Sequence, residues 1–358
     1  SGEDLKITID INLQQFIYRI MEQNNYDGSV ICSIPETGEI LAFVNTPTID
    51  IKKFSEGISE IELDSLNKLN SPYLNRGINP YLPGSVMKLP VAMMLIEEGF
   101  DKNKVYNCNG KYIFPNSSTR IYISEDGDTT KVKESKNCHA DHGDNVSLKK
   151  AISESCNVYF YQSVMDYYIK TYKNKWYDWM VKFGFSNSTN VDLLYEKEAS
   201  LKNQPSKSQM LNMVIGQEMS ATPIQVAQMI NIIANRGKLA HLHFNKEIEP
   251  KDIINLGLKK STIRFIEDAM RSVVLEGTGI NSNIVSKGAI IRAKTGTAQI
   301  RSRSQEDNQN KNSHAWYAGY IEYGKNQKIS VVVMLERGGS GGIESPFLAK
   351  KIFNKIIQ

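Results

Sequence analysis

The sequence lacks any long uninterrupted hydrophobic run. No stretch approaches the roughly 18 to 20 apolar residues that a membrane-spanning helix needs, and no apolar signal-peptide core follows the amino terminus. An excess of one charge is missing too, because 43 lysines and arginines face 39 aspartates and glutamates, mixed along the chain. These absences predict a soluble chain and give no indication of a nucleic-acid partner.

Cysteine is also scarce. The four cysteines among 358 residues are too few for a small scaffold held together by disulfides. The sequence contains no internal repeat, which excludes a solenoid. With 41% hydrophobic residues, a chain of this length can bury a large core, so we expect a globular protein.

Hydrophobic periodicity predicts strands near both ends of the chain. A first amphipathic helix capped by Asp10 precedes two β-rich runs, which a Pro-Glu-Thr-Gly turn joins into an expected hairpin at 29–44. Three further strands and a last helix are expected at 289–293, 315–321, 329–335 and 346–357. Sheet residues therefore come from both ends of the sequence.

The middle of the chain has mainly helical periodicity. Helices are expected at 85–98, 148–161, 176–183, 223–234 and 263–275. Residues 107–146 are polar and weakly periodic, which predicts an irregular segment, and the polar stretch 301–313 predicts a mobile loop. The order predicts an α/β protein with a sheet subdomain (1–84 and 286–358) and an inserted, all-helical subdomain. The insertion covers 85–285 and is expected to be helical apart from the irregular segment.

Ser85 and Lys88 form the first motif that suggests chemistry. They lie three residues apart at the start of a predicted helix, which places both on one face. A serine hydroxyl becomes a good nucleophile when a base lies within hydrogen-bond reach, and a buried lysine that has lost its proton can be that base. On its own a Ser-x-x-Lys pair is more often two exposed residues of a helix, so the pattern needs support from elsewhere.

Two further motifs follow in the sequence. Ser-Cys-Asn at 155–157 taken alone indicates the polar end of a helix. Lys-Thr-Gly-Thr at 294–297 ends a β-rich run, where a lysine can attract a carboxylate and a glycine lets another backbone approach the strand edge. Together, in this order, the three motifs are those of penicillin-binding proteins and serine β-lactamases.

Beyond the motifs, the chain resembles the transpeptidase domain of a class B penicillin-binding protein, closest to the penicillin-binding protein 2 group. The similarity extends to the residues at 38–42, 216–217, 221–225 and 314–320. It implies the serine β-lactamase and transpeptidase fold, a central antiparallel five-stranded sheet flanked by helices with an inserted helical subdomain. It also implies a membrane helix and an amino-terminal pedestal that precede this chain in the native protein.

The resemblance implies roles for the first two motifs. Ser85 is expected to attack the carbonyl of a D-Ala-D-Ala stem peptide of peptidoglycan, with neutral Lys88 accepting its proton. Ser155 is expected to relay a proton to the leaving amine, and Asn157 to hydrogen-bond an amide of the acyl chain. The result is an acyl-enzyme that the amine of a second strand resolves into a cross-link.

The third motif is expected to bind the substrate. Lys294 and Thr295 would hold the carboxylate of the terminal D-alanine or of a β-lactam, next to Gly296. The backbone N–H groups of Ser85 and Thr297 would form an oxyanion hole, because donors aimed at developing charge stabilise it well. β-Lactam antibiotics would acylate the same serine and leave slowly.

Three of the cysteines bracket a polar segment that also contains two histidines. The candidate metal ligands are Cys108, Cys138, Cys156 and either His139 or His142. Zinc favours such sulfur and nitrogen donors, although unrelated thiols or a Cys108–Cys138 disulfide would also fit the sequence. Some elongation-type relatives bind zinc through similar positions and a His-Gly pair, and this resemblance favours a structural zinc with His142 as ligand.

The resemblance further implies the surroundings of the protein. These are the extracytoplasmic face of a bacterial membrane, a polymerase that makes the glycan strands, and the elongation or septation machinery. An elongation, division or spore-wall role stays open.

Four alternatives to a transpeptidase are open on sequence grounds. A D,D-carboxypeptidase would differ only in passing the acyl group to water. A class A β-lactamase would carry a Glu-x-x-Leu-Asn pattern after Ser155, which this sequence lacks. A β-lactam sensor commonly has valine in place of Asn157, and a purely structural wall protein would not need Lys88 and Lys294.

Overall fold

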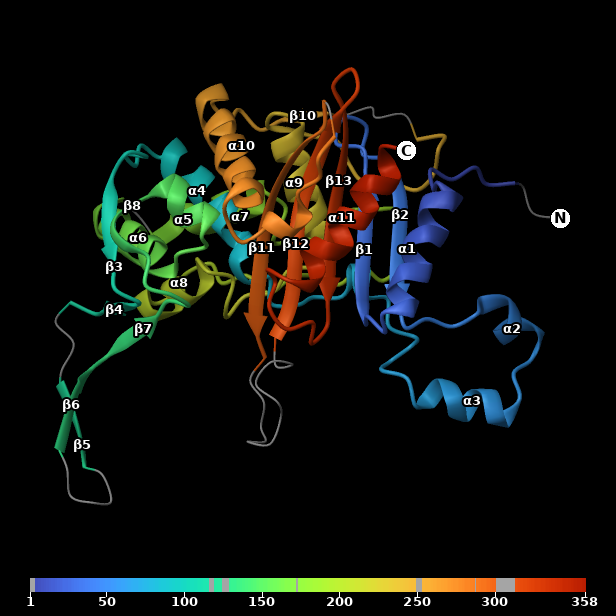
Figure 1. Ribbon diagram of the computed structural model, residues 1–358, viewed down its shortest axis with the longest axis horizontal. Coiled ribbons are helices and arrows are strands. Elements are labelled where there is room, and N and C mark those ends of the chain that lie inside the picture. Colours follow the sequence, from blue (N-terminus) through green and yellow to red (C-terminus); the bar gives the residue numbers. More distant parts are fainter. Residues whose placement is uncertain are drawn as a thin grey trace.

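A five-stranded antiparallel sheet forms the centre of the computed structural model, which describes residues 4–115, 119–123, 129–171, 173–248, 253–286, 288–300 and 313–358 (Figure 1). The strand order is β11-β12-β13-β1-β2, and each neighbouring pair is antiparallel. The strands are β1 (Gly28–Ser33), β2 (Ile40–Thr46), β11 (Ile290–Gln299), β12 (Ser313–Tyr323) and β13 (Gln327–Leu335). The prediction of a sheet built from both ends of the chain is confirmed.

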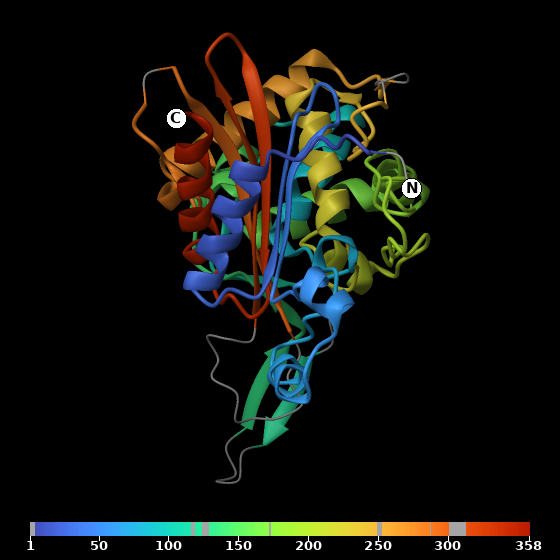
Figure 2. The same ribbon diagram turned by 90° about the vertical axis from the view of Figure 1, so that its right-hand side faces the viewer.

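Both faces of this sheet are covered by helices. On β13, Val331 and Val333 pack into one hydrophobic core, while Val332 and Met334 pack into the other, as the alternation of strand side chains requires. Figure 2 shows α1 (Ile11–Gln23) and α11 (Glu344–Ile356) on the first face and α9 (Pro223–Ala234) on the second. Each fully buried aliphatic side chain of this kind stabilises the fold by about 1.5 to 3 kcal/mol.

The sequence between β2 and β11 supplies most of the helices. Besides two helices directly after β2, these are α4 (Lys88–Glu97), α5 (Leu148–Ser153), α6 (Asn157–Thr171), α7 (Lys173–Lys182), α8 (Lys207–Met213), α9 and α10 (Lys260–Leu275). The predicted helix at 148–161 is wrong in one respect, because it is interrupted between α5 and α6. Ser155 has a φ of 61°, a left-handed conformation that no continuous α-helix contains.

The predicted irregular segment, 107–146, is largely made of short strand pairs. They are β3 (Val105–Cys108) with β8 (Gly143–Ser147), β4 (Lys111–Ile113) with β7 (Ser135–Asn137), and β5 (Thr119–Ile123) with β6 (Thr129–Lys133). A further pair joins β9 (Lys238–Leu239) to β10 (Ile254–Asn255), so the expectation of an all-helical insertion is wrong. These strands pair through backbone hydrogen bonds and are only two to five residues long, so hydrophobic periodicity could not reveal them.

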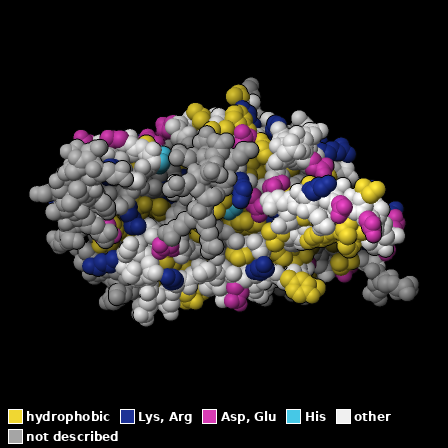
Figure 3. Space-filling model, turned by 90° about the horizontal axis from the view of Figure 1, so that it is seen from below, with side chains coloured by type: hydrophobic (Ala, Val, Ile, Leu, Met, Phe, Trp, Pro, Cys, Tyr) yellow, Lys and Arg dark blue, Asp and Glu magenta, His cyan; other side chains and the backbone are white. Residues whose placement is uncertain are grey.

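Two short helices after β2 extend away from the body of the protein. They are α2 (Ile51–Glu56) and α3 (Glu60–Asn67), and neither has a buried residue. Figure 3, a view from below, shows hydrophobic side chains on this side of the molecule, and Ile51 and Ile61 are 76% and 81% exposed. Within the described ranges, no helix is long and apolar enough to cross a membrane. The loop predicted at 301–313 lies outside the described residues, except for Ser313.

Candidate active site and metal centre

A cleft of about 1080 Å³ lies beside β11, at one edge of the sheet. Residues from all three sequence motifs line it, namely Ser85, Ser155, Asn157, Thr295 and Thr297. These residues are up to 212 positions apart in the sequence, and the fold brings them to one surface. The structure therefore brings residues of the three motifs together at one cleft.

Ser85 is held close to β11 by a tight turn. It lies in η2 (Gly84–Met87), a 3₁₀ turn that leads into α4, rather than in the α-helix that the sequence predicted. Gly84 has a φ of 57°, and a Cβ atom there would lie 2.6 Å from the carbonyl oxygen of Thr297. Only glycine fits such a conformation and such a contact. The turn therefore brings the backbone of the Ser85 segment against the strand segment expected to share the oxyanion hole.

Lys88 connects the first motif to the second. Its side chain is fully buried, and its Nζ donates to the Ser155 carbonyl oxygen at 2.6 Å, the Ser155 Oγ at 3.1 Å and the Asn157 Oδ1 at 2.7 Å. Burial, partly opposed by the sulfur atoms of Cys138 and Cys156, lowers the pKa of Lys88 to about 8. A larger fraction of this amine is therefore neutral, as a general base must be.

Acylation of Ser85 is expected to accelerate with increasing pH. The neutral form of Lys88 is the reactive base, so the rate should rise through its lowered pKa of about 8 and then level off. Lys294, on which the charge of Lys88 acts, is itself fully buried, whereas Lys136 lines the cleft. The check is the acylation rate with a fluorescent penicillin between about pH 6 and about pH 9. A rate that does not change over that range would contradict the role of Lys88.

Ser155 holds a strained backbone at the break between α5 and α6. A non-glycine residue in the left-handed region costs about 1 to 3 kcal/mol, and such residues persist where their surroundings hold them. The N–H of Cys156 donates to the Ala151 carbonyl at 2.9 Å, which ends α5. The conformation directs both the carbonyl and the hydroxyl of Ser155 to Lys88.

The third motif lies within β11 rather than at the end of a strand. Lys294 is fully buried, and its Nζ donates to the Thr295 carbonyl at 2.9 Å. Burial, followed by the charge of Lys88, lowers the pKa of Lys294 well below its usual value. Thr295 and Thr297 are two residues apart on the strand, so their side chains lie on the same face, and both line the cleft. A Cβ atom at Gly296 would lie 3.0 Å from the Pro83 carbonyl, so this glycine permits the close approach of the Ser85 segment.

Four potential metal ligands converge directly behind the second motif. The ligand atoms of Cys108, Cys138, His142 and Cys156 all lie within 4.8 Å of one another. The His142 Nδ1 is 3.4 Å from the Cys108 Sγ and 3.6 Å from the Cys138 Sγ, which is 4.0 Å from the Cys156 Sγ. A tetrahedral zinc with Zn–S distances near 2.3 Å would place its sulfur ligands about 3.8 Å apart. The four residues therefore fit zinc, and none of the four cysteines of the chain forms a disulfide.

The two candidate histidines differ in their placement. His142 is buried, and its Nε2 lies 3.3 Å from the Glu154 carbonyl oxygen, to which it can donate. That arrangement leaves the Nδ1 lone pair for the cluster, as is usual for a histidine that binds a metal. His139 is exposed and lies outside the four-residue cluster, with its Nδ1 4.0 Å from the Cys138 Sγ. Of the two histidines, His142 is the one that lies in the cluster with the three cysteines.

The cluster contacts the backbone of the second motif. Cys156 is itself the middle residue of that motif, and the Asn157 N–H donates to the Cys138 Sγ at 3.1 Å. The Tyr159 N–H donates to the Cys156 Sγ at 3.5 Å. An ion held by these sulfur atoms would therefore fix the backbone that follows the strained Ser155.

Sequence reasoning missed several residues that line the cleft. They are Tyr81, Thr278, Glu218, His314 and Ser340, among others. The Thr278 Oγ1 lies 2.5 Å from the Thr295 Oγ1, and the ring of Tyr81 packs edge-on against that of His314 at 5.2 Å. No local pattern marks these residues, because they reach the cleft only through the fold.

The chain matches the family described as the penicillin binding protein transpeptidase domain, over residues 28–358. It is 28% identical over 391 residues to the peptidoglycan D,D-transpeptidase MrdA of Haemophilus influenzae, covering 100% of this chain and 57% of that protein. It is 29% identical over 384 residues to MrdA of Acinetobacter baumannii, covering 99% of this chain and 54% of that protein. The chain therefore spans about half the length of the curated relatives it matches.

Solved structures share the fold. A complex of penicillin-binding protein PBP2 and MreC from Helicobacter pylori superposes with a TM-score of 0.83 at 26% identity, over 99% of this chain and 64% of that chain. Pseudomonas aeruginosa PBP2 in complex with WCK 5153 also gives 0.83 at 26% identity, over 99% of this chain and 79% of that chain. The likeness covers the sheet, the helical insertion and the cleft between them.

Proposed function

Because the chain belongs to the penicillin-binding protein transpeptidase family, we propose that it is a serine D,D-transpeptidase that cross-links peptidoglycan stem peptides. The observation that carries the proposal is the cleft lined by Ser85, Ser155 and Thr295, with the buried amine of Lys88 directly behind it. The relatives named peptidoglycan D,D-transpeptidase support the same activity.

Acylation is the first step. The Oγ of Ser85 attacks the carbonyl of the penultimate D-alanine, and its proton passes to neutral Lys88. Lys88 donates to Ser155, so a proton can pass along this pair to the departing nitrogen. The peptide bond breaks, the terminal D-alanine leaves as a free amine, and an ester remains on Ser85.

Binding of the substrate is assigned to β11. Lys294 and Thr295 hold the terminal carboxylate, and Asn157 bonds an amide of the acyl chain. The Ser85 and Thr297 N–H groups stabilise the negative charge on the carbonyl oxygen during attack. The close contact of the Gly84 turn with Thr297 supports this last assignment.

The acceptor completes the cycle. The amine of a second stem peptide attacks the ester, a new amide bond forms, and the proton returns to Ser85. A D,D-carboxypeptidase would use water here, and a β-lactam would leave a stable acyl group on the same oxygen. The MrdA relatives favour the amine as acceptor.

We further propose that Cys108, Cys138, His142 and Cys156 hold a structural zinc ion. Four protein ligands complete the coordination of a tetrahedral ion. The ion would therefore join segments of the chain to one another and leave no coordination position for a substrate. The Cys138 Sγ accepts from the Asn157 N–H, and the Cys156 Sγ accepts from the Tyr159 N–H. These contacts support a role for the ion in bracing the backbone next to Ser155.

The cellular setting is proposed from the family. The native protein acts at the extracytoplasmic face of the bacterial membrane through an amino-terminal anchor, beside a glycan-strand polymerase and the wall-elongation machinery. The MrdA relatives and the Helicobacter pylori PBP2 complex with MreC support elongation over division. Its ligands are then D-Ala-D-Ala stem peptides and β-lactam antibiotics.

Incubation with a D-Ala-D-Ala pentapeptide, with and without an amine acceptor, tests the activity. We expect release of D-alanine and, with acceptor, a cross-linked product, both absent in Ser85→Ala. Release of D-alanine without any cross-linked product would favour a carboxypeptidase. Rapid hydrolysis of a penicillin in place of stable labelling would favour a β-lactamase, and labelling without any action on the peptide would favour a sensor.

A further inference from the structure

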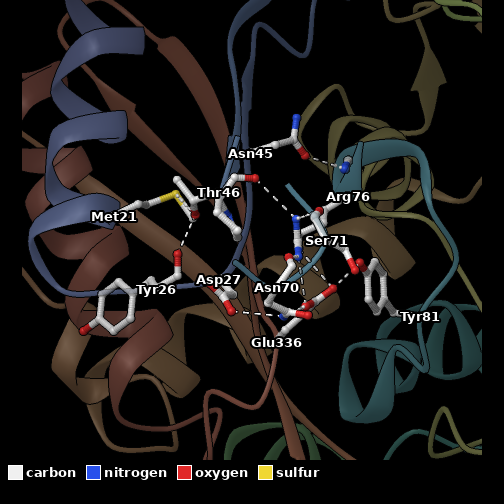
Figure 4. Close-up of polar contacts among 12 residues, drawn as sticks. Met21, Tyr26, Asp27, Asn45, Thr46, Asn70, Ser71, Arg76, Tyr81 and Glu336 are labelled. Carbon is white, nitrogen blue, oxygen red and sulfur yellow. Dashed lines mark hydrogen bonds and ion pairs between the residues drawn. The ribbon is translucent and has the colours of Figure 1, made fainter. Parts of the chain in front are cut away.

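A largely buried carboxylate, Glu336, joins several segments next to the cleft (Figure 4). It directly follows β13, and only 13% of its side chain is exposed. Its Oε1 accepts from the Tyr81 hydroxyl at 2.6 Å and lies 3.1 Å from the Arg76 Nε. Its Oε2 accepts from the Asn70 Nδ2 at 2.8 Å and the Arg76 Nη2 at 3.3 Å. Both oxygen atoms are therefore fully engaged.

Tyr81 links this carboxylate to the nucleophile. It lines the cleft four residues before Ser85. Its backbone N–H and carbonyl pair with Ala221 at 3.0 and 2.8 Å, and its ring packs against that of His314. Burial and the bond to Glu336 raise the pKa of Tyr81, so its hydroxyl remains protonated and donates. The segment that leads to Ser85 is thus fixed at its backbone and at its ring.

Arg76 contacts both oxygen atoms of the carboxylate. It begins η1 (Arg76–Ile78) and is fully buried. Besides Glu336, its guanidinium donates to the carbonyl oxygens of Asn70 and, at 3.2 Å, Ser71. A buried carboxylate without a partner would be strongly unfavourable, so Arg76 and Glu336 stabilise each other in one geometry.

The residues after Glu336 form another wall of the same cleft. Ser340 and Gly342 line it, and the Gly341 N–H donates to the Thr297 Oγ1 at 3.0 Å. Glu336 therefore stands where the loop that contacts Thr297 begins, and its carboxylate holds the segment that carries Ser85. One side chain therefore connects two walls of the site.

We propose that Glu336 is a positioning residue for acylation, which holds Tyr81 and through it orients Ser85 relative to Thr297. It does not contact the substrate itself. This inference rests on the proposed acylation of Ser85. A displacement of about 1 Å in a reacting group can cost about 100-fold in rate, so loss of this support is expected to affect the chemical step.

The variants Glu336→Gln and Tyr81→Phe test the proposal, with Glu322→Gln as the matched control. Glu322 pairs with Arg292 at 2.9 Å across β11 and β12 and is also partly buried, but this pair, unlike that of Glu336 with Tyr81, includes no residue of the cleft lining. Acylation by a fluorescent penicillin would be followed over a range of concentrations, with Tm measured in parallel. We expect the maximal acylation rate to fall about tenfold or more in Glu336→Gln and Tyr81→Phe, with similar half-saturating concentrations. Glu322→Gln should keep the wild-type rate.

The double variant adds a second criterion. Its loss of acylation rate should be little larger than that of Glu336→Gln alone, because the hydroxyl that Tyr81→Phe removes donates to the carboxylate that is already changed. Folded variants that acylate at the wild-type rate would overturn the inference, as would an equal loss in Glu322→Gln. If Glu336→Gln does not fold, Tyr81→Phe, which removes a single hydroxyl, decides. A wild-type chain that is never labelled would contradict the proposed function and this inference together.

Discussion

Replacement of Lys88 by methionine is expected to slow acylation of Ser85 by about 10²- to 10⁴-fold, the range that general-base catalysis contributes. Methionine keeps an unbranched apolar chain of similar length but removes the amine. It also leaves three acceptors without their donor, on Ser155 and Asn157. The measurement is the rate of covalent labelling with a fluorescent penicillin, beside Tm.

A second buried lysine provides the control for this change. Lys328 is 8% exposed and donates to the Ala234 carbonyl at 2.6 Å, outside the cleft lining. Lys328→Met is expected to lower Tm, because it leaves the Ala234 carbonyl without its hydrogen-bond donor. The folded variant should keep the wild-type acylation rate. Equal losses of rate in the two variants would show that burial of a lysine, and not base catalysis, explains the effect.

Loss of the proposed zinc ion is expected to reduce both stability and acylation. A zinc site filled at about a thousand times its Kd adds about 4 kcal/mol to the folded state, which corresponds to a fall in Tm of roughly 5 to 10 °C on removal. Without the ion, the contacts of Cys138 and Cys156 with the second motif lose their support, and the strained Ser155 is free to relax. Cys156→Ala and complete chelation should have the same effect.

Zinc content gives a readout that is independent of activity. Elemental analysis is expected to find about one zinc per wild-type chain and little in Cys156→Ala. Cys32→Ala is the matched control, because Cys32 is a fully buried thiol on β1, outside the cluster. It should keep its zinc and its acylation rate. A chelated protein with unchanged Tm and full acylation would rule out the bracing role.

The parts of this structure with a regular hydrophobic period were predictable. The hairpin of β1 and β2, the strands β12 and β13 and the helix α9 lie where alternation and helical spacing placed them. Asp10 caps α1 through the N–H groups of Asn12 and Leu13, as its position before the helix predicted. The three motifs could be recognised from local sequence, because their residue types carry chemistry. The fold brings residues of all three to one cleft.

Other features depend on contacts between distant residues. The break at Ser155 could not be predicted, because a left-handed serine inside an apolar helical pattern is stable only in its tertiary surroundings. No sequence pattern indicated a role for Glu336, because its partners Arg76 and Tyr81 are 260 and 255 residues away. The choice between His139 and His142 also needed the fold, which buries one ring and exposes the other.

The most direct test of the account is intact-mass analysis after incubation with benzylpenicillin, followed by peptide mapping. The account predicts one stable penicilloyl group per chain, located on the peptide that contains Ser85, and none on Ser85→Ala. An unmodified wild-type chain, or a group attached to another residue, would contradict it.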